Sequence, residues 1–357
     1  MVVKEMKSVM KIFEYRITRL IAGSIYAFIA AELFLRIFNP VPMLPRYIEA
    51  KSYGIRGNIG NLKYWHTTPD VKVQVRTNSA GMRADRNIPY RKPAGVKRIV
   101  VLGDSFGMGY EVDLKDTFLA RMNEILRNSG INCETVNLSS SGYSNAEELI
   151  VLNNEGFRYE PDLVLLAWHA SDLNENIRSN LFKLENGKLV RNAATYLPGV
   201  KIQEFLYRHP LCRLFTDNSH LFNWLRDNAG RKMKLILDYI RIGSKDNKNS
   251  KKISKIKTEE LTLALLKEIK SRCDRERCKF MIFDIPTRRT RTEFVSVFPQ
   301  VGDKNLNKFN YVNPLKKFSE YKGDLLYWER GHGHFTPEGC SLSGQVIAEF
   351  IIAHELL

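Results

Sequence analysis

The sequence lacks the short patterns that mark metal-binding and nucleic-acid-binding proteins. Its five cysteines are Cys133, Cys212, Cys273, Cys278 and Cys340. They do not form the double pairs that bind zinc, and an odd number argues against a disulfide framework. There is no Walker-type phosphate loop and no basic helix interleaved with base-stacking aromatic residues. We therefore expect buried thiols, neither a metal nor an organic cofactor, and no nucleic-acid partner.

Acidic residues are few beside the basic ones. The 357 residues include 39 Asp and Glu against 55 Lys and Arg, which gives a formal net charge of +16. This excess favours contact with phosphates, anionic lipid head groups or acidic glycans, without choosing among them. Part of it is a lysine-rich run, Lys245 to Lys257, which we interpret as a solvated linker or loop. With 44% hydrophobic residues, the chain is able to bury a full core.

The one long apolar run lies near the N-terminus. The segment Leu20–Phe38 is about long enough to cross a bilayer if Glu32 and Arg36 lie near the far interface. Five basic residues precede it: Lys4, Lys7, Lys11, Arg16 and Arg19. The positive-inside tendency then places the N-terminus in the cytoplasm and the bulk of the chain outside, and the poor small-x-small cleavage pattern favours an uncleaved single-pass anchor. A cleaved signal peptide and a buried amphipathic helix are the alternatives.

Regular alternation of strands and helices begins at Lys97. The first strand is short, apolar and β-branched, as expected of a strand that is buried on both faces of a parallel sheet. The expected elements are the strand Arg98–Gly103, helix Asp116–Gly130, strand Glu134–Leu138, helix Ser144–Phe157, strand Asp162–Trp168, helix Thr258–Cys278 and strand Lys279–Ile285. This order predicts right-handed βαβ units and a parallel sheet.

Two segments depart from this alternation. Residues 41–96 are rich in turn formers and contain one short alternating strand, Val71–Val75, so they are predicted to form a linker and an N-terminal extension. Residues 177–256, approximately, form an insertion whose apolar residues recur at spacings of three and four, which predicts amphipathic helices. These helices either pack on the core and cap the site, or lie on an anionic membrane surface. The anchor then occupies residues 1–40 and the α/β domain residues 97–357.

Candidate catalytic residues follow the strands, because ligand sites in open parallel sheets lie beyond the carboxyl ends of the strands. The groups at these positions are Asp104 and Ser105, then Ser139 to Gly142, then His169 to Asp172. A nucleophilic serine needs a base, and it needs hydrogen-bond donors aimed at the developing oxyanion. The backbone N–H groups of Ser105 and Gly142 are suitable donors.

The base is expected much later in the sequence. His332 and His334 stand directly before Thr336-Pro337-Glu338, a cap, a first-turn proline and an acid that together predict the start of a helix. A histidine held just ahead of that helix has a fixed position. Together with Glu329 the two histidines have the residue types of a metal site, but three loosely spaced ligands do not make one.

These residues resemble the motifs of the SGNH, or GDSL-type, hydrolases, which are esterases, lipases, carbohydrate deacetylases and some acyltransferases. The matching blocks are Gly103-Asp104-Ser105-Phe106, Gly142 in NLSSSGYS, His334 in HFTPEG, and Asn78-Ser79-Ala80-Gly81-Met82-Arg83, which resembles membrane-anchored bacterial members. The resemblance covers Lys97 to Ile352. It implies a flavodoxin-like three-layer α/β/α fold, with Ser105 as the nucleophile and His334 as the base.

The oxyanion side departs from the family's pattern at one position. Ser171 stands where the family has the Asn that completes the oxyanion hole, and a hydroxyl reaches less far than an amide. Loss of such a donor costs about 10² to 10³ in rate. We place Ser171 with Gly142, Asp104 and Asp172 as the predicted oxyanion and substrate-binding residues.

The acid behind the base is also missing. The family's Asp two or three residues before the histidine is replaced here by His332 and Gly331. We predict that Asp324 or Glu329 orients His334. A backbone carbonyl behind a Ser–His dyad is an alternative, and Asp172 is a weaker candidate.

The predicted function is a serine esterase that hydrolyses an acyl ester, such as an O-acetyl ester, on an envelope or exported glycan. The substrate follows from the resemblance and the predicted location, not from any pocket residue. An O-acyltransferase would use the same residues. Other readings are a catalytically impaired glycan-binding or assembly protein, on account of Ser171 and His332, and a scaffold at the membrane surface.

Overall fold

Five parallel strands form the central sheet in the order β13-β10-β7-β5-β6. Their bounds are β5 (Lys97–Gly103), β6 (Cys133–Asn137), β7 (Leu163–Trp168), β10 (Lys279–Asp284) and β13 (Asn310–Val312). This is the doubly wound order of flavodoxin-like folds. The computed structural model describes residues 2–43, 45–242, 248–298 and 309–357. The predicted fold class is confirmed, and β13 is a strand that the sequence reading missed because it is short and mixed in polarity.

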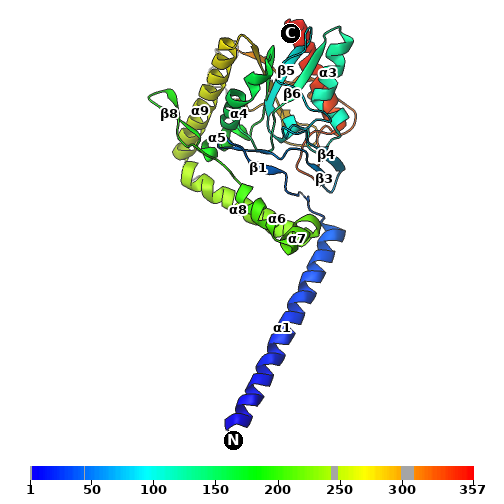
Figure 1. Cartoon of the computed structure of the whole chain (residues 1–357), viewed down its shortest axis with the longest axis vertical. Coiled ribbons are helices and arrows are strands. Elements are labelled where there is room, and N and C mark those ends of the chain that lie inside the picture. The colour runs from blue at the N-terminus through cyan, green and yellow to red at the C-terminus, as the bar shows by residue number, and fades with distance from the viewer. Residues whose placement is uncertain (1, 44, 243–247, 299–308) are drawn as a thin grey trace.

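Helices cover both faces of this sheet (Figure 1). On one face α3 (Phe118–Asn128) and α12 (Pro337–Ala353) pack against the side of β5 that carries Ile99 and Val101. On the other face α4 (Asn145–Asn154) and α9 (Lys248–Arg275) pack against Val100 and Leu102. The side chains of these four residues of β5 are fully buried. The continuous apolar run of β5 is therefore explained by a strand with no solvent face.

The smaller elements join this framework. They are α2 (Ser105–Met108), η1 (Leu114–Asp116), η2 (Gly156–Tyr159), α5 (Asp172–Ser179), β11 (Thr287–Arg288), β12 (Phe294–Val295) and α11 (Leu315–Glu320). The predicted cap of the last helix is confirmed: the Thr336 side chain accepts a hydrogen bond from the Gly339 N–H at 3.2 Å, with Pro337 in the first turn. This cap fixes the point at which the chain leaves the site and enters α12.

The N-terminal extension forms two small antiparallel pairs. They are β1 (Ile48–Ala50) with β2 (Arg56–Asn58), and β3 (Lys63–Thr67) with β4 (Lys72–Arg76). The predicted strand Val71–Val75 corresponds to β4. Side chains of β2 reach the loop after β6, where Asn58 donates to the Ser139 carbonyl at 3.1 Å. The extension thus packs on the carboxyl end of the sheet.

The insertion contains a hairpin as well as the predicted amphipathic helices. The hairpin is β8 (Phe182–Glu185) and β9 (Lys188–Arg191), and the helices are α6 (Val200–Arg208), α7 (Pro210–Asn218) and α8 (His220–Ile242). Asn186 and Gly187 both have positive φ, the turn geometry for which an Asn-Gly pair is the sequence signal.

The lysine-rich run is not the loop that the sequence suggested. Residues 245–247 lie outside the described residues, and residues 248–257 form the first part of α9. The helix continues without a break into its apolar half, which packs on the sheet. Packing of the later turns therefore extends the helix into a segment whose own composition is that of a linker.

The apolar N-terminal segment lies in a single long helix, α1 (Val2–Phe38), which projects from the rest of the molecule (Figure 1). Its part Phe13–Phe38 is long and apolar enough to cross a membrane, and only 6% of its most apolar window is buried. That exposure contradicts the alternative of a buried amphipathic helix. By length and composition the segment fits either a membrane span or a signal sequence.

Arg98 provides a stability test of the sheet. Its guanidinium is fully buried, pairs with Glu134 at 2.5 Å and donates to the carbonyls of Tyr90 and Tyr159 at 2.6 and 2.7 Å. Arg98→Met leaves two carbonyls without this donor and the Glu134 carboxylate with only the exposed Arg86 as a partner, so we expect a loss of about 3 to 5 kcal/mol in the free energy of unfolding, measured by urea denaturation in detergent. Arg121→Met, which removes an exposed ion pair, should cost under about 1 kcal/mol. Equal effects of the two substitutions would contradict this account.

Candidate active site

Ser105 lies at a tight passage from strand to helix. β5 ends at Gly103, and the Asp104 side chain caps α2 by accepting the Phe106 N–H at 2.8 Å. A Cβ atom at Gly107 would lie 2.4 Å from the Ser139 hydroxyl oxygen. Gly107 therefore lets α2 approach the loop that follows β6.

His334 lies within hydrogen-bond distance of this serine. Its Nε2 is 2.7 Å from the Ser105 Oγ. The ring is buried, and it packs at 4.8 Å against the ring of Phe106. Its carbonyl accepts the Trp328 N–H at 2.9 Å, and α12 begins three residues later. The structure thus brings together the two residues predicted as nucleophile and base.

Glu111 completes the chain of contacts. Its Oε2 lies 2.9 Å from the His334 Nδ1, and the backbone N–H groups of His332 and His334 donate to the same carboxylate at 2.9 and 3.2 Å. Burial alone would raise the pKa of Glu111, but the hydrogen bond and the charge of His334 outweigh it and lower the pKa to about 2. The carboxylate is therefore ionised at neutral pH and holds the Nδ1–H tautomer of His334.

Arg83 holds the loop that carries Glu111. Glu111 has a φ of +65°, which is unfavourable for a side chain with a Cβ atom. The Arg83 guanidinium is buried and donates to the carbonyls of Met108 at 3.1 Å and Val112 at 2.5 Å, and to that of Gly109. These bonds tie down both sides of Glu111 and stabilise the strained turn. Arg83 is the last residue of the Asn78-to-Arg83 motif, which thereby has a structural role at the site.

The prediction that Asp324 or Glu329 orients His334 is wrong. Glu329 forms an ion pair with Arg291 at 3.1 Å near the surface, and Asp324 lines a separate cavity of about 610 Å³. The family pattern predicts an acid shortly before His334. In the structure the acid that contacts His334 is Glu111, in the loop that follows Ser105. The available signal was a lone acid, Glu111, between Tyr110 and Val112, which are apolar and buried.

His332 serves the site through its backbone. Its ring packs 5.2 Å from the ring of His66, a fully buried residue whose two ring nitrogens have no hydrogen-bond partner among the described residues. Burial, followed by the proximity of His332, lowers the pKa of His66 to about 3, so this imidazole is neutral. In the part of the chain that the structure describes, no cluster of three or more His, Cys, Asp or Glu residues could hold a metal ion.

Gly142 has a backbone conformation that favours glycine. Its φ is +73°, and a Cβ atom there would lie 2.2 Å from the Arg56 Nη2, which donates to the Gly142 carbonyl at 2.7 Å. Asn58 holds the same loop through the Ser139 carbonyl and the Ser140 hydroxyl at 3.1 and 3.0 Å. Two side chains of β2 thus fix the peptide groups on the predicted oxyanion side.

Ser171 does not replace the missing Asn in any contact that the structure shows. Its hydroxyl lies 2.8 Å from the His169 Nδ1. Asp172 is buried and accepts from the His169 N–H and the Asn145 amide, both at 3.2 Å. Burial raises the pKa of Asp172 well above its ordinary value, and the nearby Glu148 carboxyl adds to this effect. These contacts, like the capping role of Asp104, lie inside the fold and not at the Ser105 hydroxyl.

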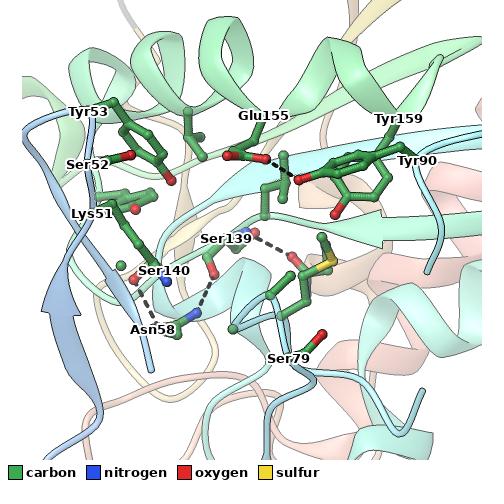
Figure 2. Close-up of a pocket in the computed structure, with 18 residues that line it drawn as sticks. Lys51, Ser52, Tyr53, Asn58, Ser79, Tyr90, Ser139, Ser140, Glu155 and Tyr159 are labelled. Carbon is green, nitrogen blue, oxygen red and sulfur yellow. Dashed lines mark hydrogen bonds between the residues drawn. The ribbon is translucent and has the colours of Figure 1, made fainter. Parts of the chain in front are cut away.

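A cavity of about 240 Å³ lies beside the loop after β6 (Figure 2). Ser139, Ser140 and Asn58 line one side of it, and the Tyr90 hydroxyl donates to Glu155 at 2.9 Å on the other. Neither Ser105 nor His334 lines this cavity. The cavity is therefore not the binding pocket of the Ser105 site.

The Glu111 carboxylate makes the stability of the protein depend on pH. Because its folded-state pKa is lowered from 4.5 to about 2, it contributes about 3 kcal/mol above pH 4.5, and this contribution is lost as the pH falls towards 2. Urea unfolding between pH 7 and pH 2 should show a weaker pH dependence for Glu111→Gln than for the unchanged protein. Glu329→Gln is the matched control and should retain the full dependence. An unchanged slope in Glu111→Gln would refute the assignment.

The chain matches no family model and no curated protein. Among solved structures it is similar to a GDSL-like lipase from Bacteroides thetaiotaomicron, at 12% identity and a TM-score of 0.37 over 75% of this chain and 93% of that one. It is also similar to an acetyl xylan esterase, at 11% identity and a TM-score of 0.38 over 72% and 98%. A third is a two-domain esterase active on acetylated mannans, at 9% identity and a TM-score of 0.37 over 72% and 49%. The order of its own strands is that of a flavodoxin-like three-layer α/β/α fold, in which Ser105 follows β5 and His334 precedes α12.

Proposed function

We propose that the protein is a serine esterase in which Ser105, His334 and Glu111 form the catalytic triad. The observation that carries this proposal is the continuous line of contacts from the Ser105 hydroxyl to the His334 ring at 2.7 Å and on to the Glu111 carboxylate at 2.9 Å. A buried acid, a fixed imidazole and a serine at the carboxyl edge of the sheet are the parts that acyl transfer to a hydroxyl requires.

The reaction then proceeds in two halves. Ser105 Oγ attacks the ester carbonyl carbon while the His334 Nε2 takes its proton, and Glu111 stabilises the imidazolium that forms. The backbone N–H groups of Ser105 and Gly142 donate to the oxyanion. The tetrahedral intermediate expels the alcohol, which receives the proton from His334 and leaves an acyl-enzyme. Water, deprotonated by His334, attacks the acyl carbon, and the acid leaves as Ser105 regains its proton.

We infer that the natural substrate is an O-acyl ester on an envelope or exported glycan. The proposal combines the family resemblance with α1 as a single-pass anchor, whose basic start lies in the cytoplasm and whose following domain lies in the periplasm. Acetylated xylan and mannan are suitable first substrates to assay. A sugar hydroxyl in place of water would make the same triad an acyltransferase. The presence of Glu111 beside His334 argues against an impaired site, because the acid missing from the usual position is supplied from another loop.

The first test is covalent capture of the serine. Purified full-length protein in detergent is exposed to a fluorophosphonate and examined by intact-mass analysis, in parallel with hydrolysis of p-nitrophenyl acetate. We expect one adduct and measurable turnover, both lost in Ser105→Ala and His334→Ala. A folded protein that neither labels nor hydrolyses would overturn the proposal and favour a binding protein.

Glu111 is expected to contribute more to kcat/KM than the other nearby acids. Glu111→Gln should lower kcat/KM by about 10³ to 10⁴, because it removes the group that fixes the His334 tautomer and stabilises the imidazolium. Asp324→Asn and Glu329→Gln should stay within about threefold of the unchanged enzyme, since neither carboxyl contacts His334. Steady-state kinetics on p-nitrophenyl acetate separate these outcomes. A large loss in Glu329→Gln with a small one in Glu111→Gln would exclude this triad.

Substitution of Ser171 is expected to have little effect on kcat. Its hydroxyl is bonded to His169, so Ser171→Ala should lower kcat by less than about tenfold, whereas removal of a true oxyanion donor lowers kcat by about 10² to 10³. Single-turnover acylation measures this step directly. A drop of a hundredfold or more would assign Ser171 to the oxyanion hole.

A further inference from the structure

The helices of the insertion expose an unusual amount of apolar surface. Ten large apolar side chains of α6, α7 and α8 are between 39% and 71% exposed: Ile202, Phe205, Leu211, Leu214, Phe215, Trp224, Leu225, Met233, Leu235 and Ile236. Basic residues outnumber acidic ones in the sequence of the same helices, which contains Lys201, Arg208, Arg213, Arg226, Arg231, Lys232, Lys234 and Arg241 against Glu204, Asp217, Asp227 and Asp238. An apolar surface of this extent, accompanied by positive charge, is typical of helices that bind a lipid surface.

This surface is attached to the end of α1. The Glu32 carboxylate accepts the backbone N–H groups of His220 and Leu221 at 3.0 and 2.8 Å, and the Ser219 hydroxyl at 2.8 Å. It therefore caps the start of α8, where a helix dipole favours a negative charge. Arg36 pairs with Glu32 at 2.7 Å and donates to the Asn218 carbonyl at 2.5 Å. The two charged residues near the end of the apolar helix thus bind the corner between α7 and α8.

A ring contact gives the depth of α7 relative to α1. Phe28 and Phe215 pack edge to face with their centroids 5.9 Å apart. Phe28 lies ten residues before Phe38, about 15 Å along the helix axis, and inside the apolar segment Phe13–Phe38. Figure 1 shows α6, α7 and α8 lying across this end of α1, beneath the sheet domain. A bilayer crossed by α1 would therefore meet the exposed apolar side chains of α7.

We propose that α6, α7 and α8 lie in the outer interface of the bilayer that α1 crosses. Their apolar side chains enter the lipid, and their basic side chains lie among the phosphates of anionic lipids. This inference rests on α1 as an anchor, which is part of the proposed function, but it concerns a different segment of the chain.

The same placement determines which side of the sheet domain, relative to the bilayer, carries Ser105. The amino ends of the strands lie away from α1, because Lys279 at the start of β10 donates to the Glu355 carbonyl near the C-terminus, which Figure 1 places at the far end of the molecule. The carboxyl ends, with Ser105, therefore lie on the side of the sheet domain that is nearer the three helices. Substrate reaches the triad from the space next to the bilayer.

The test measures lipid contact at single positions of the full-length protein in vesicles of phosphatidylcholine and phosphatidylglycerol. Cys212 is replaced by serine, and a cysteine labelled with an environment-sensitive fluorophore is placed at Leu211 or Leu214, both exposed. Nitroxide-bearing lipids should quench these labels several-fold more strongly than a label at Ser129, an exposed position at the amino ends of the strands. A water-like spectrum without quenching at Leu211 and Leu214 would overturn the proposal.

A label at Ile25, within α1, separates failure of this inference from failure of the anchor. Quenching at Ile25 but not at Leu211 would retain the anchor and reject the lipid-bound helices. Absence of quenching at Ile25 would reject the anchor and with it this inference, while p-nitrophenyl acetate hydrolysis on the same samples reports the esterase separately. Protection of Leu211 from water without lipid quenching, together with crosslinks between Leu211→Cys chains, would replace the bilayer by a second copy of this chain.

Discussion

The site depends on one buried carboxylate. Glu111 accepts the His334 Nδ1–H and the backbone N–H groups of His332 and His334, so it fixes the imidazole and the backbone that carries it. This arrangement also explains Gly331, which lies directly before His332 in the same loop. A Cβ atom at Gly331 would lie 1.9 Å from the Glu111 Oε1, and no side chain fits there while the carboxylate is present. The Glu111 carboxylate thus occupies the space that a side chain at position 331 would need.

Keeping a carboxylate in that place requires support from the N-terminal extension. Arg83 binds carbonyls on both sides of Glu111, and Arg56 and Asn58 bind the loop that carries Gly142. Residues 41–96 therefore act as more than a connection between the apolar helix and the sheet. Their side chains bind the loop that carries Glu111 and the loop that carries Gly142, and the extension and sheet share one core through Ile55 and Met82. A cut at residue 97 would separate the site from the side chains that hold it.

The parts of the structure that were predictable from sequence are those with local signals. A few adjacent residues are enough to identify each of three features: the apolar β-branched run of β5, the cap at Thr336 and the motif Gly103-Asp104-Ser105-Phe106. Glu111 is not identified in this way, because its role arises only when a loop 223 residues away folds against it. The prediction of a loop at the lysine-rich start of α9 was wrong for the opposite reason, because packing of the later turns outweighed the local composition. The Asn186-Gly187 hairpin had a local signal that was overlooked within a segment assigned to helices.

The spacing of the proposed triad along the chain has a consequence for folding during synthesis. Ser105 and Glu111 belong to one short loop, so the entropy needed to bring them together is small and both are in place once β5 and its neighbours have formed. His334 lies directly before α12, which packs beside α3, so it reaches them only after the C-terminal part of the chain has been synthesised. A partly synthesised chain therefore holds a serine without its base. In the proposed mechanism, Ser105 therefore gains its base only when the C-terminal part of the chain docks.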